Sequence, residues 1–289
     1  DIDVLCLEEG LLKQSNIRYL RHDGKDFSYL RELMRNDYDA IVDFMVYPTI
    51  GEFVPYADLY LDNTKHYIFT STYRVYGSEY PITEKSPRLW DLLRAGKLPE
   101  DFVEDYEYSI YKAKCEDYLL SGKKRNWSII RPTITYSKAR FQLTVLEAGT
   151  LIHRMHANKT VVLPEGAMDC EGTLSWAGDF GICVSKLVLN ENAFGEAYTI
   201  GTSEHHTWRE IAEIYKKIGG LEYITVDDDT FVNEIFGGST ATAQQLKYDR
   251  CYNRVIDNEK ILKATNRKAS DFMPLEQGLT MELENYDNA

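Results

Sequence analysis

Residues 40–46 read Ala-Ile-Val-Asp-Phe-Met-Val, an almost continuous apolar run. Runs of this kind are typical of strands that are buried on both faces of a parallel sheet. Strand-like stretches also occur at 4–7, 17–20, 66–72 and 127–132, and helical stretches separate most of them. Strands that alternate with helices indicate right-handed β-α-β units. We therefore predict an α/β fold built on a doubly wound parallel sheet.

The second half of the chain is less regular and predicts a smaller α/β lobe folded onto the first half. We expect helices over 141–156 and about 179–190, and strands over 160–163 and 197–200. A further helix is expected to open at Thr207, because Glu210 stands three residues later, at the spacing of a capping box.

Composition argues against several classes of protein. The chain has 289 residues, a formal net charge of −13 and a pI of about 5.0, which argues against nucleic acid as a partner. No apolar run approaches the roughly 18 to 20 residues of a membrane span, and the chain opens without the basic stretch of a signal peptide. The five cysteines and the histidine pairs lack metal-ligand spacing. We expect a cytoplasmic protein with no metal site and no membrane partner.

Thr72, Tyr108 and Lys112 are the strongest candidates for a chemical site. Thr72 ends a strand-like stretch, and Tyr108 and Lys112 stand four apart in a predicted helix, so both lie on one face. A tyrosine has a pKa of about 10, and a neighbouring cation favours its phenolate form. With the Thr72 hydroxyl holding a substrate oxygen, the set is suited to oxidising a hydroxyl group. Taken alone, the Tyr-x-x-x-Lys spacing is better explained as a solvated helix face, because the chain holds 21 tyrosines.

The order of several short motifs supplies context for this site. They are Ser71-Thr72 with Val75-Tyr76-Gly77, Pro81-Ile82-Thr83-Glu84, Tyr108 to Lys112 with Glu116, Arg131-Pro132, Trp176-Ala177-Gly178-Asp179 and Tyr198-Thr199-Ile200-Gly201. In this arrangement the chain resembles the extended short-chain dehydrogenase/reductases, the NAD-dependent epimerase/dehydratase family, over nearly its whole length. No single motif is diagnostic, but their shared order is a strong signal.

The resemblance implies a domain division and a role for each candidate residue. Residues 1–136 would form a Rossmann-like dinucleotide-binding domain, and residues 137–289 mainly a substrate-binding lobe, with some segments returning to the sheet. Thr72, Tyr108 and Lys112 would be catalytic. The residues expected to contact the cofactor are Glu8, Asp23, Phe44, Met45, Tyr47, Ser71, Lys112 and Arg131. Those expected to contact the substrate are Tyr73, Arg140 and Arg250.

Several of these residues have structural alternatives. Asp23 is equally expected as a turn residue, and Glu8, with Glu9, as part of a surface loop. Arg131 is better explained as a brace between sheet and lobe, whereas Arg140 is equally expected in a solvated loop or at a substrate diphosphate.

The family's first strand and its Gly-x-x-Gly-x-x-Gly phosphate loop have no counterpart in the sequence. That loop receives the pyrophosphate of the dinucleotide at a helix N-terminus. We expect roughly 25 to 30 residues to precede Asp1, since a strand–turn–helix unit is about that long. The alternative is a protein that has lost its main cofactor anchor. Glu8, which follows the first predicted strand, favours NAD, with NADP left open.

The reaction implied is hydride transfer from a carbinol carbon to the nicotinamide while Tyr108 takes the hydroxyl proton. Sugar 4,6-dehydratases of the family carry an Asp-Glu pair directly after the catalytic Thr, where this chain has Tyr73-Arg74. The resemblance therefore favours an epimerase or oxidoreductase acting on a nucleotide sugar or similar substrate over a 4,6-dehydratase. The alternative is a non-catalytic nucleotide-binding or scaffold protein of the same fold. A homodimer through residues 51–61 and 105–121 is implied by analogy alone.

Overall fold

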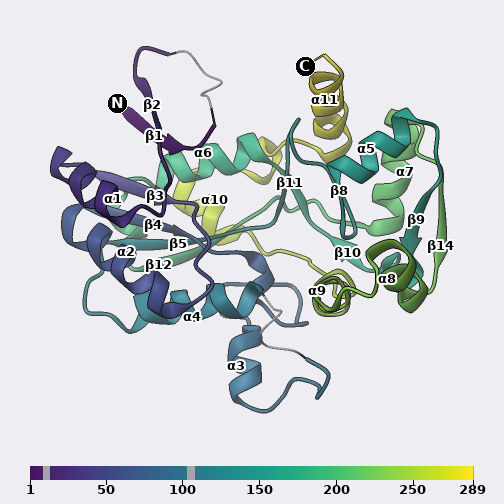
Figure 1. Ribbon diagram of the computed structural model, residues 1–289, viewed down its shortest axis with the longest axis horizontal. Helices are drawn as coiled ribbons and strands as arrows, with labels where there is room; N and C mark the ends of the chain where they lie inside the picture. Colours follow the sequence, from purple (N-terminus) through teal and green to yellow (C-terminus); the bar gives the residue numbers. More distant parts are fainter. Residues whose placement is uncertain (9–13, 103–107, 289) are drawn as a thin grey trace.

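The computed structural model describes residues 1–8, 14–102 and 108–288 and has a four-stranded parallel sheet at its centre. The order of the sheet is β12-β5-β4-β3 (Figure 1). The strands are β3 Ala40–Asp43, β4 His66–Thr70, β5 Trp127–Pro132 and β12 Glu196–Ile200. β12 comes from the second half of the chain and pairs in parallel with β5.

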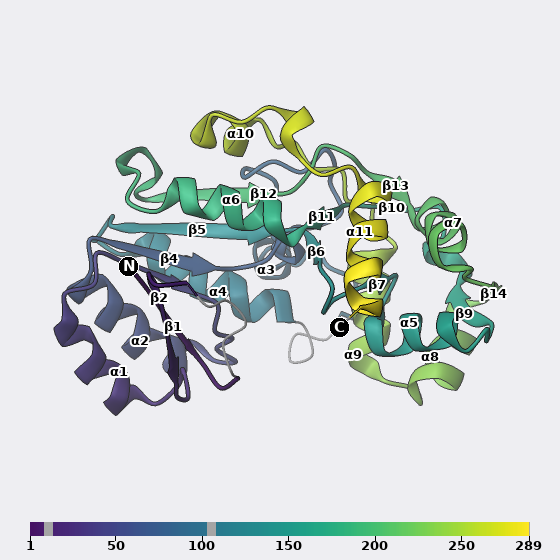
Figure 2. The same cartoon turned by 90° about the horizontal axis from the view of Figure 1, so that it is seen from above.

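Helices cover both faces of this sheet (Figure 2). α2 Ile50–Asn63 and α4 Tyr108–Ser121 cover one face, and α6 Ala177–Leu187 and α10 Glu259–Thr265 cover the other. Neighbouring residues of β4 alternate between the two cores: Phe69 packs with Phe53 of α2, and Ile68 packs in the cluster of Leu187 and Ile261. This alternation accounts for the continuous apolar runs, and it confirms the predicted doubly wound α/β fold.

β1 Ile2–Cys6 and β2 Ile17–Arg21 form a separate parallel pair, and α1 Phe27–Leu33 follows them. Among the described residues, no strand pairs with the free edges of β1 and β3. Figure 2 shows β1 and β2 running at a steep angle to β4 and β5. In the usual order 3-2-1-4-5-6, the first strand lies between the second and the fourth. The break between β1 and β3 therefore lies at the place that the first strand takes in that order.

The second lobe is built from short strands and helices around the largest apolar cluster. Its strands are β6 Ile134–Tyr136, β7 Gln142–Leu143, β8 Leu146–Glu147, β9 Val161–Pro164, β10 Glu171–Gly172, β11 Leu174–Trp176, β13 His206–Thr207 and β14 Tyr223–Val226. Its helices are α5 Ala148–His156, α7 Trp208–Gly219, α8 Asp228–Phe236, α9 Thr240–Gln245 and α11 Leu275–Asp287, while α3 Leu89–Arg94 belongs to the first half. None of the helices in the described ranges has the length and apolar character of a membrane span.

The helix predicted over 141–156 begins only at Ala148, so its first half was wrongly predicted. β7 and β8 form an antiparallel hairpin instead, with Gln142 opposite Glu147. Thr144 in the turn has a φ of 52°, a left-handed conformation that no α-helix accommodates. The buried hairpin brings the Thr144 carbonyl to Arg250, 2.7 Å from its Nε.

α7 begins with the capping box that the sequence predicts. The Thr207 hydroxyl accepts a hydrogen bond from Glu210 N at 3.2 Å, and Glu210 Oε2 accepts one from Thr207 N at 2.8 Å. We expect Thr207→Ala to lower the free energy of unfolding by about 1 kcal/mol, because the cap satisfies an end amide of the helix. Urea denaturation measures this loss. Thr280→Ala in α11 is the matched control: the Thr280 hydroxyl donates to the Glu276 carbonyl one turn earlier in the same helix and caps no helix end, so we expect little change.

Candidate active site

The candidate site lies at the carboxyl ends of β3 and β4, the edge at which parallel α/β sheets bind ligands. Thr72 lies two residues after the end of β4, and its hydroxyl oxygen accepts a hydrogen bond from Arg74 N at 3.2 Å. The proton of this hydroxyl is the donor that Thr72 can offer to a substrate oxygen. Tyr108 and Lys112 lie in the first two turns of α4, which packs beside this end of β4.

Lys112 ties the ends of two strands to α4. Its side chain is 2% exposed, and Nζ donates hydrogen bonds to the carbonyls of Met45 at 2.9 Å and Thr70 at 2.7 Å. The same nitrogen lies 4.8 Å from the centre of the Phe69 ring and 5.9 Å from that of Tyr108. Burial lowers the pKa of Lys112 to about 8, although the buried Asp43 carboxyl acts in the opposite direction.

This lowered pKa predicts a pH-dependent contribution to stability. Between pH 8 and 10.5 the folded chain has lost the Lys112 proton while the unfolded chain retains it, so stability rises with pH. Relative to a Lys112→Met variant, we expect the wild-type free energy of unfolding to gain roughly 2 to 4 kcal/mol across this window. Urea denaturation of both proteins at a series of pH values measures the difference. A difference that stays constant with pH would contradict the expectation.

Tyr108 is half-buried and is influenced by two arginines. Burial raises the pKa of its phenol, while the positive charges of Arg74 and Arg140 lower it. The Arg74 guanidinium carbon lies 5.7 Å from the centre of the Tyr108 ring. The sequence alone predicts Lys112 as the activating charge and marks Arg74 only as a departure from the dehydratase pattern. The signal in the sequence that could have placed Arg74 near the site is its position two residues after Thr72.

The segment expected to line the dinucleotide is fixed by the buried Asp43. This carboxylate accepts hydrogen bonds from Met45 N at 2.8 Å, Tyr67 Oη at 2.9 Å and Tyr47 Oη at 3.1 Å, and burial raises its pKa. Tyr47 is only 1% exposed and belongs to the core. Phe44, in contrast, is 61% exposed, with its ring near Phe180 of α6.

The other expected cofactor contacts differ in their surroundings. Asp23 is exposed and accepts a hydrogen bond from Lys25 N at 2.9 Å, as an ordinary turn residue does. Glu8 is exposed just beyond β1, and Glu9 lies outside the described residues. Ser71 is 2% exposed and lies beside Glu116.

Arg131 acts as a brace inside the protein. It is 3% exposed, and its Nε and Nη2 donate to the two oxygens of Glu116 at 2.8 and 2.7 Å. Its Nη1 donates to Tyr76 Oη at 2.6 Å. Arg88 also donates to Glu116, at 3.1 Å. This network joins α4 to β5 and to the segment after Thr72.

Of the expected substrate contacts, two are buried and one is exposed. Arg250 and Tyr73 are 2% and 3% exposed and are bound to each other at 3.1 Å and to Asp249. Arg140 is exposed and donates to Thr135 Oγ1 at 3.4 Å. The structure thus places Arg74 next to Tyr108, and it places Arg250 in the interior between the two halves of the chain.

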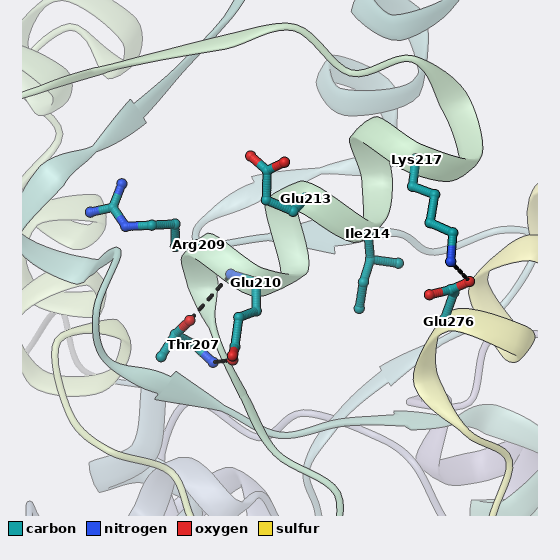
Figure 3. A pocket seen from close by; sticks show the side chains of 7 residues that line it. All are labelled: Thr207, Arg209, Glu210, Glu213, Ile214, Lys217 and Glu276. Atoms are coloured by element: carbon teal, nitrogen blue, oxygen red, sulfur yellow. Dashed lines mark hydrogen bonds and ion pairs between the residues drawn. The ribbon is translucent and has the colours of Figure 1, made fainter.

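A shallow hollow lies elsewhere, along the outer face of α7 (Figure 3). Its charged side chains already have partners: Lys217 pairs with Glu276, Arg209 binds Asp169, and Glu213 accepts from Tyr223. None of the predicted site residues lines it. We therefore assign it no chemistry.

No protein-family profile matches the chain, and no curated protein matches it in sequence. Solved structures, however, share its fold. The dTDP-glucose 4,6-dehydratase of Bacillus anthracis, in complex with NAD, matches with a TM-score of 0.69 and 17% identity over 95% of this chain and 81% of its own. The UDP-glucose 4-epimerase of Thermotoga maritima, with UDP-glucose, matches with a TM-score of 0.69 and 15% identity over 99% of this chain and 90% of its own. The UDP-glucuronic acid 4-epimerase of Bacillus cereus, with UDP-glucuronic acid and NAD, matches with a TM-score of 0.64 and 17% identity over 95% of this chain and 83% of its own.

Proposed function

We propose that the protein is an NAD(P)-dependent epimerase or oxidoreductase that acts on a hydroxyl group of a nucleotide sugar. The observation that supports this proposal is that Thr72 lies just beyond the carboxyl end of β4, while Lys112, one turn after Tyr108 in α4, donates to the Thr70 carbonyl at that end. The neighbours with this fold include sugar-nucleotide epimerases and a dehydratase, some of them solved with NAD. Fold alone does not fix function, so the proposal depends on the residues of this site.

The residues at the ends of β3 and β4 fit the nicotinamide end of a dinucleotide. Thr70 Oγ1 is buried and has no hydrogen-bond partner within the described part of the chain, so a ligand hydroxyl would satisfy it. The exposed ring of Phe44 offers an apolar surface at the same edge, and Lys112 would hold the ribose. When bound, the dinucleotide would supply hydride transfer at the carbinol carbon. Thr70, Phe44 and Lys112 are thus the proposed contacts on this side.

The protein's own residues would manage the proton and the oxygen of the substrate. The Tyr108 phenolate would take the hydroxyl proton as the carbinol carbon becomes a carbonyl carbon, and would return it on reduction. The Thr72 hydroxyl would donate a hydrogen bond to the same oxygen and hold it in line. The positive charges of Arg74 and Arg140 would favour the phenolate, against the effect of burial.

The residues after Thr72 support epimerisation or simple oxidation rather than loss of water. Elimination needs an acid and a base beside the sugar. Tyr73 is buried against Asp249, and burial raises its pKa to about 12, while Arg74 is a cation that cannot act as a base. Neither position therefore holds a carboxyl group for the elimination step.

The direct test is incubation of the purified protein with UDP-glucose and NAD, followed by proton NMR of the nucleotide sugars. We expect the 4-epimer to appear, or an oxidised sugar with reduced dinucleotide, and we expect no 4-keto-6-deoxy sugar. Formation of the 4-keto-6-deoxy product would contradict the assignment. Tight binding of the dinucleotide, with no turnover of neutral or acidic nucleotide sugars, would favour a non-catalytic nucleotide-binding protein.

A further inference from the structure

Asp43 is a buried acidic residue that takes no direct part in the proposed proton transfer. It is the last residue of β3, at the edge of the sheet where the candidate site lies, and it is 4% exposed. Its carboxyl oxygens accept hydrogen bonds from Met45 N, Tyr47 Oη and Tyr67 Oη, and three donors favour the ionised form against the effect of burial. The titratable groups that face it are Tyr47, Tyr60, Tyr67 and Lys112, and burial raises the pKa of all three phenols. Lys112 is therefore the member of this set that can carry a positive charge.

The backbone of Met45 joins the carboxylate of Asp43 to Lys112. The Met45 amide donates to Asp43 Oδ1 at 2.8 Å, and the Met45 carbonyl accepts a hydrogen bond from Lys112 Nζ at 2.9 Å. The same Nζ donates to the Thr70 carbonyl at 2.7 Å, and Lys112 is 2% exposed. Both acceptors are neutral carbonyl groups, so the charge of this buried ammonium group has to be balanced by a carboxylate further away.

The groups around Lys112 identify Asp43 as that counter-charge. Burial lowers the pKa of Lys112 to about 8, and Asp43 is the largest influence that opposes this fall. The other titratable groups that act on the pKa of Lys112 are Cys115, Glu116 and Lys25. The carboxylate of Glu116 already has two arginine partners, and burial raises the pKa of the Cys115 thiol to about 12, which leaves it uncharged. Lys25 is itself a cation and lowers the pKa of Lys112 further.

The charge of Lys112 decides how many donors it can offer to a ligand. An ammonium group has three N–H donors, and the carbonyls of Met45 and Thr70 engage two of them. The third can donate to a ligand hydroxyl group. A neutral amine has two N–H donors, both of which the carbonyls would take. Loss of the proton would therefore remove the donor that a ribose hydroxyl needs.

We infer that Asp43 is a positioning residue of the candidate site: its carboxylate fixes the Met45 backbone and balances the Lys112 ammonium, so that Lys112 keeps a donor for the dinucleotide at neutral pH. This inference rests on the proposed function, in which Lys112 would hold the nicotinamide ribose. Asp43 would act through Met45 and Lys112, without touching the dinucleotide or the substrate.

The experiment is an NMR pH titration of protein that carries isotope labels at the ε-carbons of its lysines, with the spectrum of Lys112→Met identifying the Lys112 signal. We expect Lys112 of the wild type to titrate with a pKa of about 8. Asp43→Asn keeps the size of the side chain and removes its charge, so it should lower the proton affinity of Lys112 about ten-fold or more. Asp39→Asn is the matched control, because Asp39 is exposed and pairs with Lys65, and it should leave the Lys112 titration unchanged.

An unchanged Lys112 titration in Asp43→Asn would overturn the inference, leave Asp43 as an anchor of the turn after β3, and leave the proposed function intact. A reciprocal measurement serves where Asp43→Asn does not fold. Coupling between two sites is mutual, so Lys112→Met should raise the pKa of the Asp43 carboxyl by a similar factor, followed through labels at the aspartate γ-carbons. An Asp43 titration that is the same in Lys112→Met and in the wild type would equally overturn the inference.

Calorimetric titration of NAD at several pH values separates the positioning role from the proposed function. We expect Asp43→Asn to bind NAD up to about ten-fold more weakly than the wild type above about pH 8, and equally well in mild acid, because acid charges Lys112 in both proteins. Equal affinities at every pH, or one common loss at every pH, would contradict the positioning role. If the wild type does not bind NAD at any pH, the proposed function fails, whereas the Lys112 titration still decides whether Asp43 is its counter-charge.

Discussion

Replacing Tyr108 with phenylalanine should reduce the turnover number by about a hundred- to ten-thousand-fold, the usual contribution of a general acid-base group. The substitution removes the phenolic oxygen and leaves the ring, so the Arg74 contact with the ring face persists. Tyr108 is half-buried at the start of α4, and the free energy of unfolding should change little. Turnover of a nucleotide sugar and the urea denaturation curve measure the two effects separately.

Tyr118→Phe is the matched control for this substitution. Tyr118 lies in the same helix, and its hydroxyl donates to the exposed Asp58 at 2.5 Å, away from the ends of β3 and β4. We expect the control to retain wild-type turnover. Turnover by Tyr108→Phe within a factor of about three of the wild type would show that another group moves the proton.

Replacing Glu116 with glutamine should cost about 3 to 5 kcal/mol of stability, because it leaves the buried guanidinium of Arg131 without a counter-charge. Glu116 is fully buried and receives hydrogen bonds from Arg131 and from Arg88, whose side chain is 11% exposed. A loss of this size would lower the midpoint of thermal unfolding by about 10 °C. Thermal and urea denaturation of the two proteins measure it.

The same carboxylate predicts a change of stability in acid. Burial alone would raise the pKa of Glu116, but Arg131 and Arg88 hold it below its usual value of 4.5. Its contribution is therefore present above that pH and is lost as the pH falls further through the lowered pKa. Glu32→Gln is the control, since the pair of Glu32 with Arg35 is exposed and should contribute less than about 1 kcal/mol. Equal losses in the two variants would contradict the assigned role of Glu116.

The sheet could be predicted because each of its strands is marked in the sequence by a run of apolar residues. In residues 66–70 the neighbours Ile68 and Phe69 pack into helix layers on opposite faces, and this arrangement demands apolar residues at successive positions. The capping box at Thr207 is likewise local, since both of its hydrogen bonds join residues three apart. Tyr108 and Lys112 share a helix face for the same reason. Features set within a few residues were therefore open to prediction.

The burial of the site's neighbours could not be predicted, since it depends on contacts distant in sequence. Tyr73 and Asp249, which share a hydrogen bond, are 176 positions apart in the sequence. Arg250 is held in the interior by hydrogen bonds that it donates to the Tyr73 hydroxyl and to the carbonyl of Thr144. The hairpin before Ala148 depends on the left-handed backbone of Thr144, a conformation that the residue type Thr does not predict. The position of Arg74 beside Tyr108 follows from the turn after Thr72 together with Asp249.

The central claim is that the Thr72, Tyr108 and Lys112 site works with a nicotinamide dinucleotide. Mass spectrometry of the small molecules released when the purified protein is denatured tests it most directly. We predict that NAD or NADP is released in an amount close to that of the protein, or is bound when added. A protein that releases no dinucleotide and does not bind one added at millimolar concentration would contradict the account.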